Sequence, residues 1–146
     1  KILIAGHLLR QSLMGSDLSY EDMMEDHKLS KSYAATFDSF ANIGTIKCAV
    51  LNLTARDKKT TYQTRKVWVN PEDKTVLKEE RSAKSGKLLK RILFKDYEII
   101  SGRKFPRTMI FKDLLKENTK TTYKFDVIEF DIEIPPSYFS QSILKR

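Results

Sequence analysis

The sequence predicts a mainly β protein of the α+β class, built around one large, curved antiparallel sheet with little helix. Two observations carry this prediction. From Lys31 onward, apolar and polar residues alternate with the period of two that is typical of half-buried strands. Short turn-forming segments separate these runs, and short turns join antiparallel neighbours. We therefore expect a meander of five or more strands.

The first two expected strands, 32–43 and 45–55, form a hairpin that turns at Gly44. A charged loop follows. The later expected strands lie at 62–70, 74–82, 87–100, 104–115 and 120–134. Asn70-Pro71 and Ser101-Gly102 are examples of the turn residues between them. The pair Pro135-Pro136 ends the last strand because proline has no N–H to donate to a ladder.

One helix is expected near the start, over 20–28. Ser19 can cap it, and Asp22 follows three residues later in the pattern of a capping box. The helix has an apolar side with Tyr20, Met23, Met24 and His27, and an acidic side with Glu21, Asp22, Glu25 and Asp26. Residues 1–9 resemble the middle of a strand, which suggests that the start of the gene product is missing. Ser137 can cap a short helical turn over 137–144.

Composition places the chain among ordinary globular proteins. Its 146 residues suit one domain, 1–146, with a single hydrophobic core. Cys48 is the only cysteine, so no internal disulfide and no multi-cysteine metal site can form. The net charge of +8 comes from residues 51–146. This basic excess suits a nucleic acid, an anionic membrane surface or an acidic partner, or simply keeps the protein in solution.

The expected sheet has apolar residues on both faces. In the run 87–95, Leu88, Leu89, Ile92, Leu93 and Phe94 fall on both sides of the strand. A hollow half-barrel, with a core on one side and a second apolar surface on the other, explains this pattern. Register breaks at β-bulges, together with ordinary apolar surface, explain it equally well.

Two stretches of the chain resemble a known family. The segment SLMGSDLSYEDM at 12–23 is similar to the MGSD-x-S-x-ED signature of the LolA-like outer-membrane lipoprotein-sorting family. Residues 67–146 follow the family's series from the W-V-D strand through the G-K-L-L strand and F-x-D-Y to the closing I-P-x-x-x-F and L-x-R. Asn70 stands where the family usually has an acidic residue, and KFPRTM replaces a pattern with tryptophan before V-P-T.

The resemblance implies a LolA-type fold, in which an incomplete β-barrel encloses a hydrophobic cavity that helices close like a lid. It also implies that the chain is the carboxy-terminal part of a longer LolA-like domain, without that domain's first strands and helices. The implied function is that of a periplasmic, bacterial carrier that holds the acyl chains of lipoproteins or related lipids for sorting to the outer membrane. An inner-membrane transporter, an outer-membrane acceptor and a transient contact with a membrane surface are the implied partners.

A carrier must compensate for the transfer of a lipid out of its membrane. At about 0.8 kcal/mol per CH₂, a chain of about 14 carbons loses on the order of 10 kcal/mol on leaving a bilayer. Covering it takes roughly 400 Å² of apolar wall at about 25 cal/mol per Å². The residues expected to line such a cavity are Met14, Met23, Met24, Trp68, Leu77, Ile92, Phe94, Met109, Phe111, Tyr123 and Phe125.

Enzymatic motifs are absent from the sequence. There is no H-E-x-x-H, no glycine-rich phosphate loop and no G-x-S-x-G, so we expect neither catalysis nor a cofactor. The acidic pairs of the helix, Glu21 with Glu25 and Asp22 with Asp26, could hold a hard cation, but a solvated acidic face is the commoner use. His27 suits the end of the helix, and Cys48 suits a buried place on a strand.

Two rival functions come from other classes. The first is a sensor, or an accessory protein of the same fold that serves an inner-membrane lipid exporter; the sequence does not separate it from a carrier. The second is a nucleic-acid module with aromatic and basic residues interleaved on a sheet face. Its candidates are Lys66, Lys90, Arg91, Lys95 and Arg107 near Trp68, Phe94 and Phe105. The scatter of the basic residues over strands and turns argues against nucleic acid as a partner.

Overall fold

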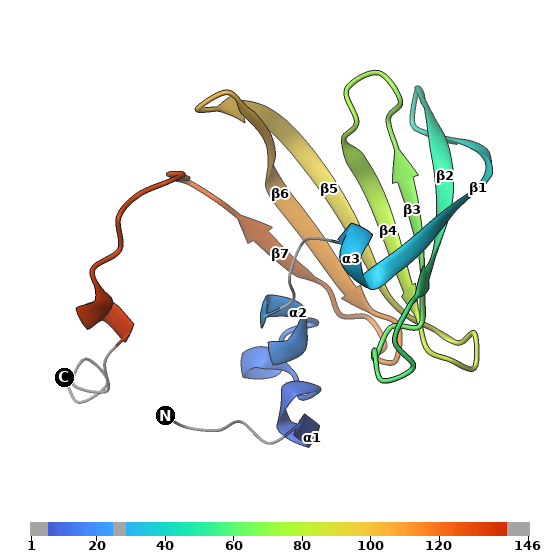
Figure 1. Cartoon of the computed structure of the whole chain (residues 1–146), viewed down its shortest axis with the longest axis horizontal. Helices are drawn as coiled ribbons and strands as arrows, with labels where there is room; N and C mark the ends of the chain where they lie inside the picture. Colours follow the sequence, from blue (N-terminus) through green and yellow to red (C-terminus); the bar gives the residue numbers. More distant parts are fainter. Residues whose placement is uncertain (1–5, 25–28, 140–146) are drawn as a thin grey trace.

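The computed structural model describes residues 6–24 and 29–139. Seven antiparallel strands follow one another in the sheet in the order β1 to β7, so the predicted meander is confirmed. Their bounds are Tyr33–Ile43 (β1), Ile46–Ala55 (β2), Thr64–Val69 (β3), Val76–Ser82 (β4), Leu88–Ile100 (β5), Arg103–Asp113 (β6) and Thr121–Lys124 (β7). The sheet curves but does not close, because β1 and β7 are its two edges (Figure 1).

The turn between β5 and β6 shows why these strands are antiparallel neighbours. Ser101 and Gly102 both have positive φ, 49° and 75°. Two such residues in succession form the tight hairpin turn whose twist matches that of the flanking strands. The turn sets the register of the β5–β6 ladder, which runs from the pair Ile100 and Arg103 to the pair Lys90 and Asp113.

The helical segments are short and lie mostly before the sheet. They are Gly6–Leu9 (α1), Leu13–Gly15 (η1), Tyr20–Met24 (α2), Leu29–Ser32 (α3) and Pro136–Phe139 (η2). The prediction of a strand over residues 1–9 is therefore wrong for residues 6–9, which are helical. Residues 1–5 lie outside the described part of the chain. Residues 25–28, including His27, and 140–146 lie outside it as well.

The predicted capping box of α2 is confirmed. The backbone N–H of Asp22 donates to Ser19 Oγ (3.2 Å), and the backbone N–H of Ser19 donates to Asp22 Oδ2 (2.8 Å). Each side chain thus satisfies a backbone donor of the other residue. This fixes the start of α2 at Tyr20.

The last expected strand, 120–134, is wrong beyond its first part, because β7 ends at Lys124. Phe125 still donates its N–H to Arg107 O (2.9 Å). The guanidinium of Arg107 then donates to the carbonyls of Phe125 and Asp126 (3.0 and 2.9 Å). The Arg107 side chain thus binds the two carbonyls that follow β7, where the chain leaves the sheet (Figure 1).

The two faces of the sheet differ in what they pack against. We call inner the face on which Leu18 and Leu29, from the segments before β1, pack. Directly paired residues share a face. One inner row consists of Leu51, Val67, Glu79, Ile92 and Phe111, and the next of Leu53, Arg65, Arg81, Lys90 and Asp113. The core therefore lies between the N-terminal segments and the inner face.

The outer face has its own apolar cluster, formed by Cys48, Val50 and Trp68. Cys48 is fully buried there, as predicted. Register also shifts, between Phe37 and Ser39 and between Trp68 and Val69. Apolar surface on both faces and β-bulges therefore both occur, and each explains part of the apolar pattern in the sequence.

Candidate functional site

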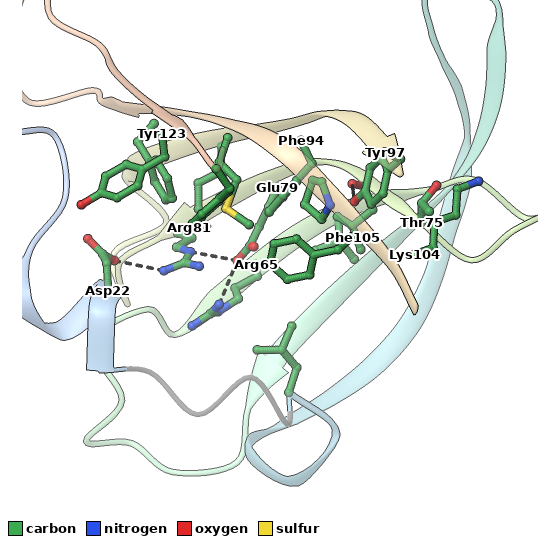
Figure 2. Close-up of a pocket in the computed structure, with 18 of the residues that line it drawn as sticks. Asp22, Arg65, Thr75, Glu79, Arg81, Phe94, Tyr97, Lys104, Phe105 and Tyr123 are labelled. Carbon is green, nitrogen blue, oxygen red and sulfur yellow. Dashed lines mark hydrogen bonds and ion pairs between the residues drawn. The ribbon is translucent and has the colours of Figure 1, made fainter. Parts of the chain in front are cut away.

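The inner face carries a pocket of about 550 Å³. Strands β3 to β7 and helix α2 contribute its wall. The apolar lining residues are Leu18, Met23, Leu29, Val67, Val76, Ile92, Phe94, Tyr97, Phe105, Pro106, Met109, Phe111, Tyr123 and Phe125. Figure 2 shows Phe94, Tyr97 and Phe105 between two polar ends, one at Asp22 and Arg81 and the other at Thr75 and Lys104.

Seven of the eleven residues expected to line a cavity lie on this pocket. They are Met23, Ile92, Phe94, Met109, Phe111, Tyr123 and Phe125. The aromatic rings among them interlock: Phe111 and Tyr123 pack edge to face at 6.0 Å between ring centroids. These residues lie together because neighbouring strands pair them directly. Ile92 of β5 pairs with Phe111 of β6, and Met109 of β6 pairs with Tyr123 of β7.

The other four expected residues do not line the pocket. Trp68 lies in the cluster on the outer face, where Leu77 packs against it and Lys78 places its ammonium 3.9 Å from the ring centroid. Trp68 alternates with Val67 and therefore points away from the pocket. Met14 is 94% exposed and Met24 is 68% exposed, and neither is among the residues that line the pocket. For all eleven residues, contact with lipid remains a prediction.

The sequence did not predict the buried charges at one end of the pocket. Arg65, Arg81 and Lys90 stand side by side in one inner row of β3, β4 and β5. Like charges directly opposite each other destabilise a sheet, so this row needs carboxylates next to it. Glu79 supplies one, since its Oε1 accepts from Arg65 Nη1 and from Arg81 Nε at 2.8 Å each.

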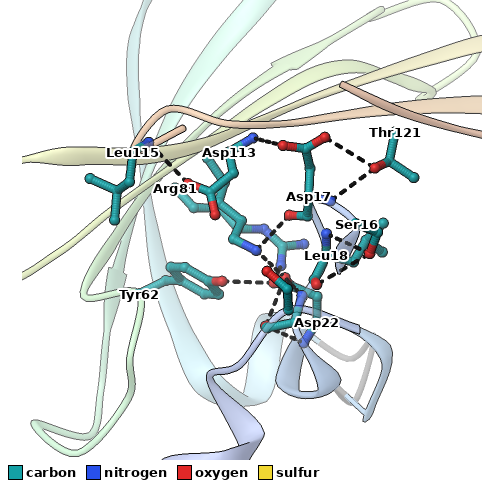
Figure 3. A network of polar contacts seen from close by, with 12 residues as sticks. Ser16, Asp17, Leu18, Asp22, Tyr62, Arg81, Asp113, Leu115 and Thr121 are labelled. Carbon is teal, nitrogen blue, oxygen red and sulfur yellow. Dashed lines mark hydrogen bonds and ion pairs between the residues drawn. The ribbon is translucent and has the colours of Figure 1, made fainter. Parts of the chain in front are cut away.

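Asp22 supplies the second carboxylate from helix α2. Its Oδ1 accepts from Tyr62 OH (2.7 Å) and Arg81 Nη1 (3.0 Å), and its Oδ2 accepts from Lys90 Nζ (2.7 Å). Figure 3 shows Tyr62 and Arg81 directed toward Asp22. The expected solvated acidic helix face is therefore wrong for Asp22, whose side chain is only 1% exposed. Glu25 and Asp26 lie outside the described residues.

This network shifts the pKa values of its members. Burial alone would raise the pKa of Asp22, but hydrogen bonds from Lys90 and the Ser19 backbone, with the Lys90 charge, outweigh burial and hold that pKa below its ordinary value. Burial, followed by repulsion from Arg81, lowers the pKa of Arg65 to about 10. Both groups are therefore charged at neutral pH, and α2 is held to the sheet by ion pairs.

Asp17 anchors the same segment to strands β6 and β7 and to the turn between them. Its carboxylate accepts from the Asp113 N–H (3.2 Å) and from Thr119 Oγ1 (2.7 Å), and its N–H donates to Thr121 Oγ1 (2.8 Å). Asp17, Ser19 and Asp22 all belong to the MGSD-x-S-x-ED signature. That signature is thus the part of the sequence that docks the helical segment, and it is the signal that could have identified the network.

The other end of the pocket is an open polar rim formed by Asp73, Lys74, Thr75 and Lys104. Lys104 Nζ forms an ion pair with Asp73 Oδ2, and Thr75 Oγ1 donates to Asp73 Oδ1 (2.6 Å). These two interactions, with Lys104 the stronger, hold the pKa of Asp73 well below its usual range. Lys74 Nζ donates to the Pro71 carbonyl (2.7 Å).

The basic and aromatic residues considered for nucleic acid do not gather on one surface. Lys66, Arg91 and Trp68 lie in outer rows, while Lys90 and Phe94 lie on the inner face. Among residues 6–24 and 29–139, no helix is long and apolar enough to cross a membrane. Within the same ranges, no group of three His, Cys, Asp or Glu side chains is placed to hold a metal ion.

An unclosed antiparallel half-barrel with helices on its inner face and an apolar pocket between them defines the LolA class of folds. Solved structures agree. A DUF1329 family protein from Desulfovibrio piger superposes with a TM-score of 0.85 at 26% identity, covering 97% of this chain and 58% of its own. A domain named for outer-membrane lipoprotein sorting, from Vibrio parahaemolyticus, gives 0.78 at 23%, covering 98% of this chain and 60% of its own.

A LolA superfamily protein from Nitrosomonas europaea gives a TM-score of 0.75 at 24% identity, covering 92% of this chain and 60% of its own. The resemblance seen in the sequence is thus confirmed at the level of the fold. The chain spans at most 60% of the length of these structures. A family model described as "uncharacterized protein" matches residues 2–146, and the chain belongs to that family. A comparison with curated proteins finds no match.

Proposed function

We propose that this protein is a periplasmic carrier that holds acyl chains of lipoproteins, or of related lipids, for sorting to the outer membrane. The observation that carries the proposal is the pocket on the inner face. Its 550 Å³ lies within the range of about 300 to 1,000 Å³ of small-molecule sites, and its centre is built from aromatic and aliphatic side chains. Its polar groups lie at the two ends, which suits a long apolar ligand.

The fold also supports a carrier. Two solved structures with this fold, though each less than 25% identical, bear names from outer-membrane lipoprotein sorting and the LolA superfamily. Membership of that fold alone does not assign a function. The pocket adds what a carrier requires, because an acyl chain outside a membrane needs an apolar wall to replace the bilayer.

The test compares two neighbouring residues of β6. Met109 lines the pocket, whereas Ile110 lies on the outer face, paired with Leu93 of β5, and both are half-buried. The full-length protein and its Met109→Glu and Ile110→Glu variants are purified from a bacterial periplasm. The bound lipids are then extracted and quantified by mass spectrometry.

We expect acylated lipid with the wild type and with Ile110→Glu, and at least a tenfold loss with Met109→Glu, because a carboxylate among apolar groups costs several kcal/mol. Equal lipid content in both variants would contradict the proposal, as would a wild type without lipid that also fails to bind added lysophospholipid. Transfer to acceptor vesicles then separates the two remaining roles. A protein that binds lipid but never releases it would be a sensor instead of a carrier.

A further inference from the structure

The pocket is long, and its two polar ends differ in how their charges are compensated. Val76 and Arg81 both line it and stand at the two ends of β4, so the wall between them is roughly 16 Å long. At the Arg81 end, charged side chains are bonded to one another and to α2. The other end is the rim with Lys74 and Lys104 (Figure 2).

The Arg81 end of the pocket is not available to a ligand head group. Its cations Arg65, Arg81 and Lys90 are at most 10% exposed, and each forms an ion pair with Glu79 or Asp22. A head group could reach them only by displacing α2 and breaking these pairs. Buried ion pairs are costly to break, since the charge left behind is uncompensated.

The rim, in contrast, is open to water and has one positive charge in excess. Lys104 is 39% exposed and forms an ion pair with the carboxylate of Asp73. Lys74 is exposed, and its ammonium donates to a neutral carbonyl, that of Pro71. A head group at the rim would remain hydrated while meeting two ammonium groups and one carboxylate.

We propose that the ligand of this pocket is an acyl lipid with a negatively charged head group, a carboxylate or a phosphate, which lies at Lys74 and Lys104. This inference rests on the proposed carrier function. The acyl chain runs from the rim past Phe94 and Met109 toward Ile92. Asp73 opposes the head group and competes with it for Lys104, so removing the Asp73 charge strengthens binding.

The protein offers a matched control for each rim variant. Lys66 and Asp38 form a Lys–Asp pair away from the pocket, and Lys66 lies in an outer row. That pair has nearly the same exposure as Lys104 and Asp73, with side chains 40% and 32% exposed against 39% and 29%. Lys66→Gln and Asp38→Asn therefore change the net charge by the same amount as Lys104→Gln and Asp73→Asn, but at a distance from the rim.

The experiment measures displacement of a fluorescent fatty acid from the delipidated full-length protein. The competitors share one palmitoyl chain: palmitate, palmitoyl lysophosphatidic acid and the neutral glycerol ester. We expect Lys104→Gln to weaken the binding of both anionic competitors by about two- to fivefold, which is the range that an exposed ion pair contributes. Asp73→Asn should strengthen both, and the combined Lys74→Gln, Lys104→Gln variant should lose more than Lys104→Gln alone. The neutral ester should bind equally to all variants.

A difference between palmitate and the lysophosphatidic acid would show which anionic group the rim prefers. The inference is overturned if the neutral ester binds wild type as tightly as the anions do, or if Lys66→Gln weakens the anions as much as Lys104→Gln. Either result leaves the carrier function standing, because the acyl chain still binds. Failure of all three competitors to displace the probe would instead contradict the carrier function itself.

Discussion

Asp22 of helix α2 and Lys90 of strand β5 form a buried ion pair, with Asp22 Oδ2 2.7 Å from Lys90 Nζ. The two residues are far apart in the sequence, and Lys90 Nζ also donates to the Asp17 carbonyl (2.8 Å). One ammonium group thus holds the segment before α2 and the helix itself against the sheet. The position of α2 at the end of the pocket depends on this contact.

Replacing the carboxylate of Asp22 should therefore release α2. Asp22→Asn keeps the size of the side chain but removes the carboxylate that pairs with Lys90 and with Arg81, while Arg81 keeps its ion pair with Glu79. We expect a loss of about 3 kcal/mol in the free energy of unfolding, which is the cost of removing one partner of a buried ion pair. Urea unfolding followed by circular dichroism measures it. Asp38→Asn, in an exposed pair, is the control and should change little; similar losses in both variants would contradict the assignment.

The Asp22 carboxylate should also make the free energy of unfolding depend on pH. The folded-state pKa values of Asp22 and Asp17 lie below the ordinary value of 3.8, so ionisation of both stabilises the fold at higher pH. That stability is present above pH 3.8 and is lost as the pH falls through the folded-state values. Urea midpoints measured from about pH 7 to about pH 3 should fall more steeply for the wild type than for Asp22→Asn. Parallel curves would show that Asp22 does not contribute.

Trp68 should be insensitive to lipid. It is 8% exposed, lies on the outer face and packs with Val50 and Cys48, on the side of the sheet away from the pocket. Its fluorescence emission should therefore stay constant while a lysophospholipid saturates the protein. A shift in the emission maximum that follows the binding curve would place lipid on the outer face instead.

The sequence predicted the local features of this fold well. The turn at Ser101-Gly102 and the capping box of Ser19 and Asp22 depend on neighbouring residues, so the residue types alone specify them. Ile92, Met109 and Phe111, which the strand pattern offers as cavity-lining residues, do line one pocket. These predictions succeeded because each rests on contacts within one strand, one turn or one hairpin.

What the sequence did not show depends on partners far along the chain. Sequence alone favours a solvated Asp22 because Tyr62, Arg81 and Lys90 approach it only in the folded protein. The sequence cannot place Trp68 on the outer face, because alternation separates two faces without telling which one is inward. The irregularity beside it, between Trp68 and Val69, is likewise not visible in the pattern.

The carrier function requires an acyl chain to occupy the inner-face pocket. Photo-crosslinking detects that chain in place, with a fatty acid that carries a diazirine in the middle of its chain and peptide mapping by mass spectrometry. We predict saturable labels on the peptides of β5 and β6 that contain Phe94 and Met109, competed by unlabelled palmitate. Labels centred on Trp68 and its outer-face neighbours, or labels that do not saturate, would contradict the claim.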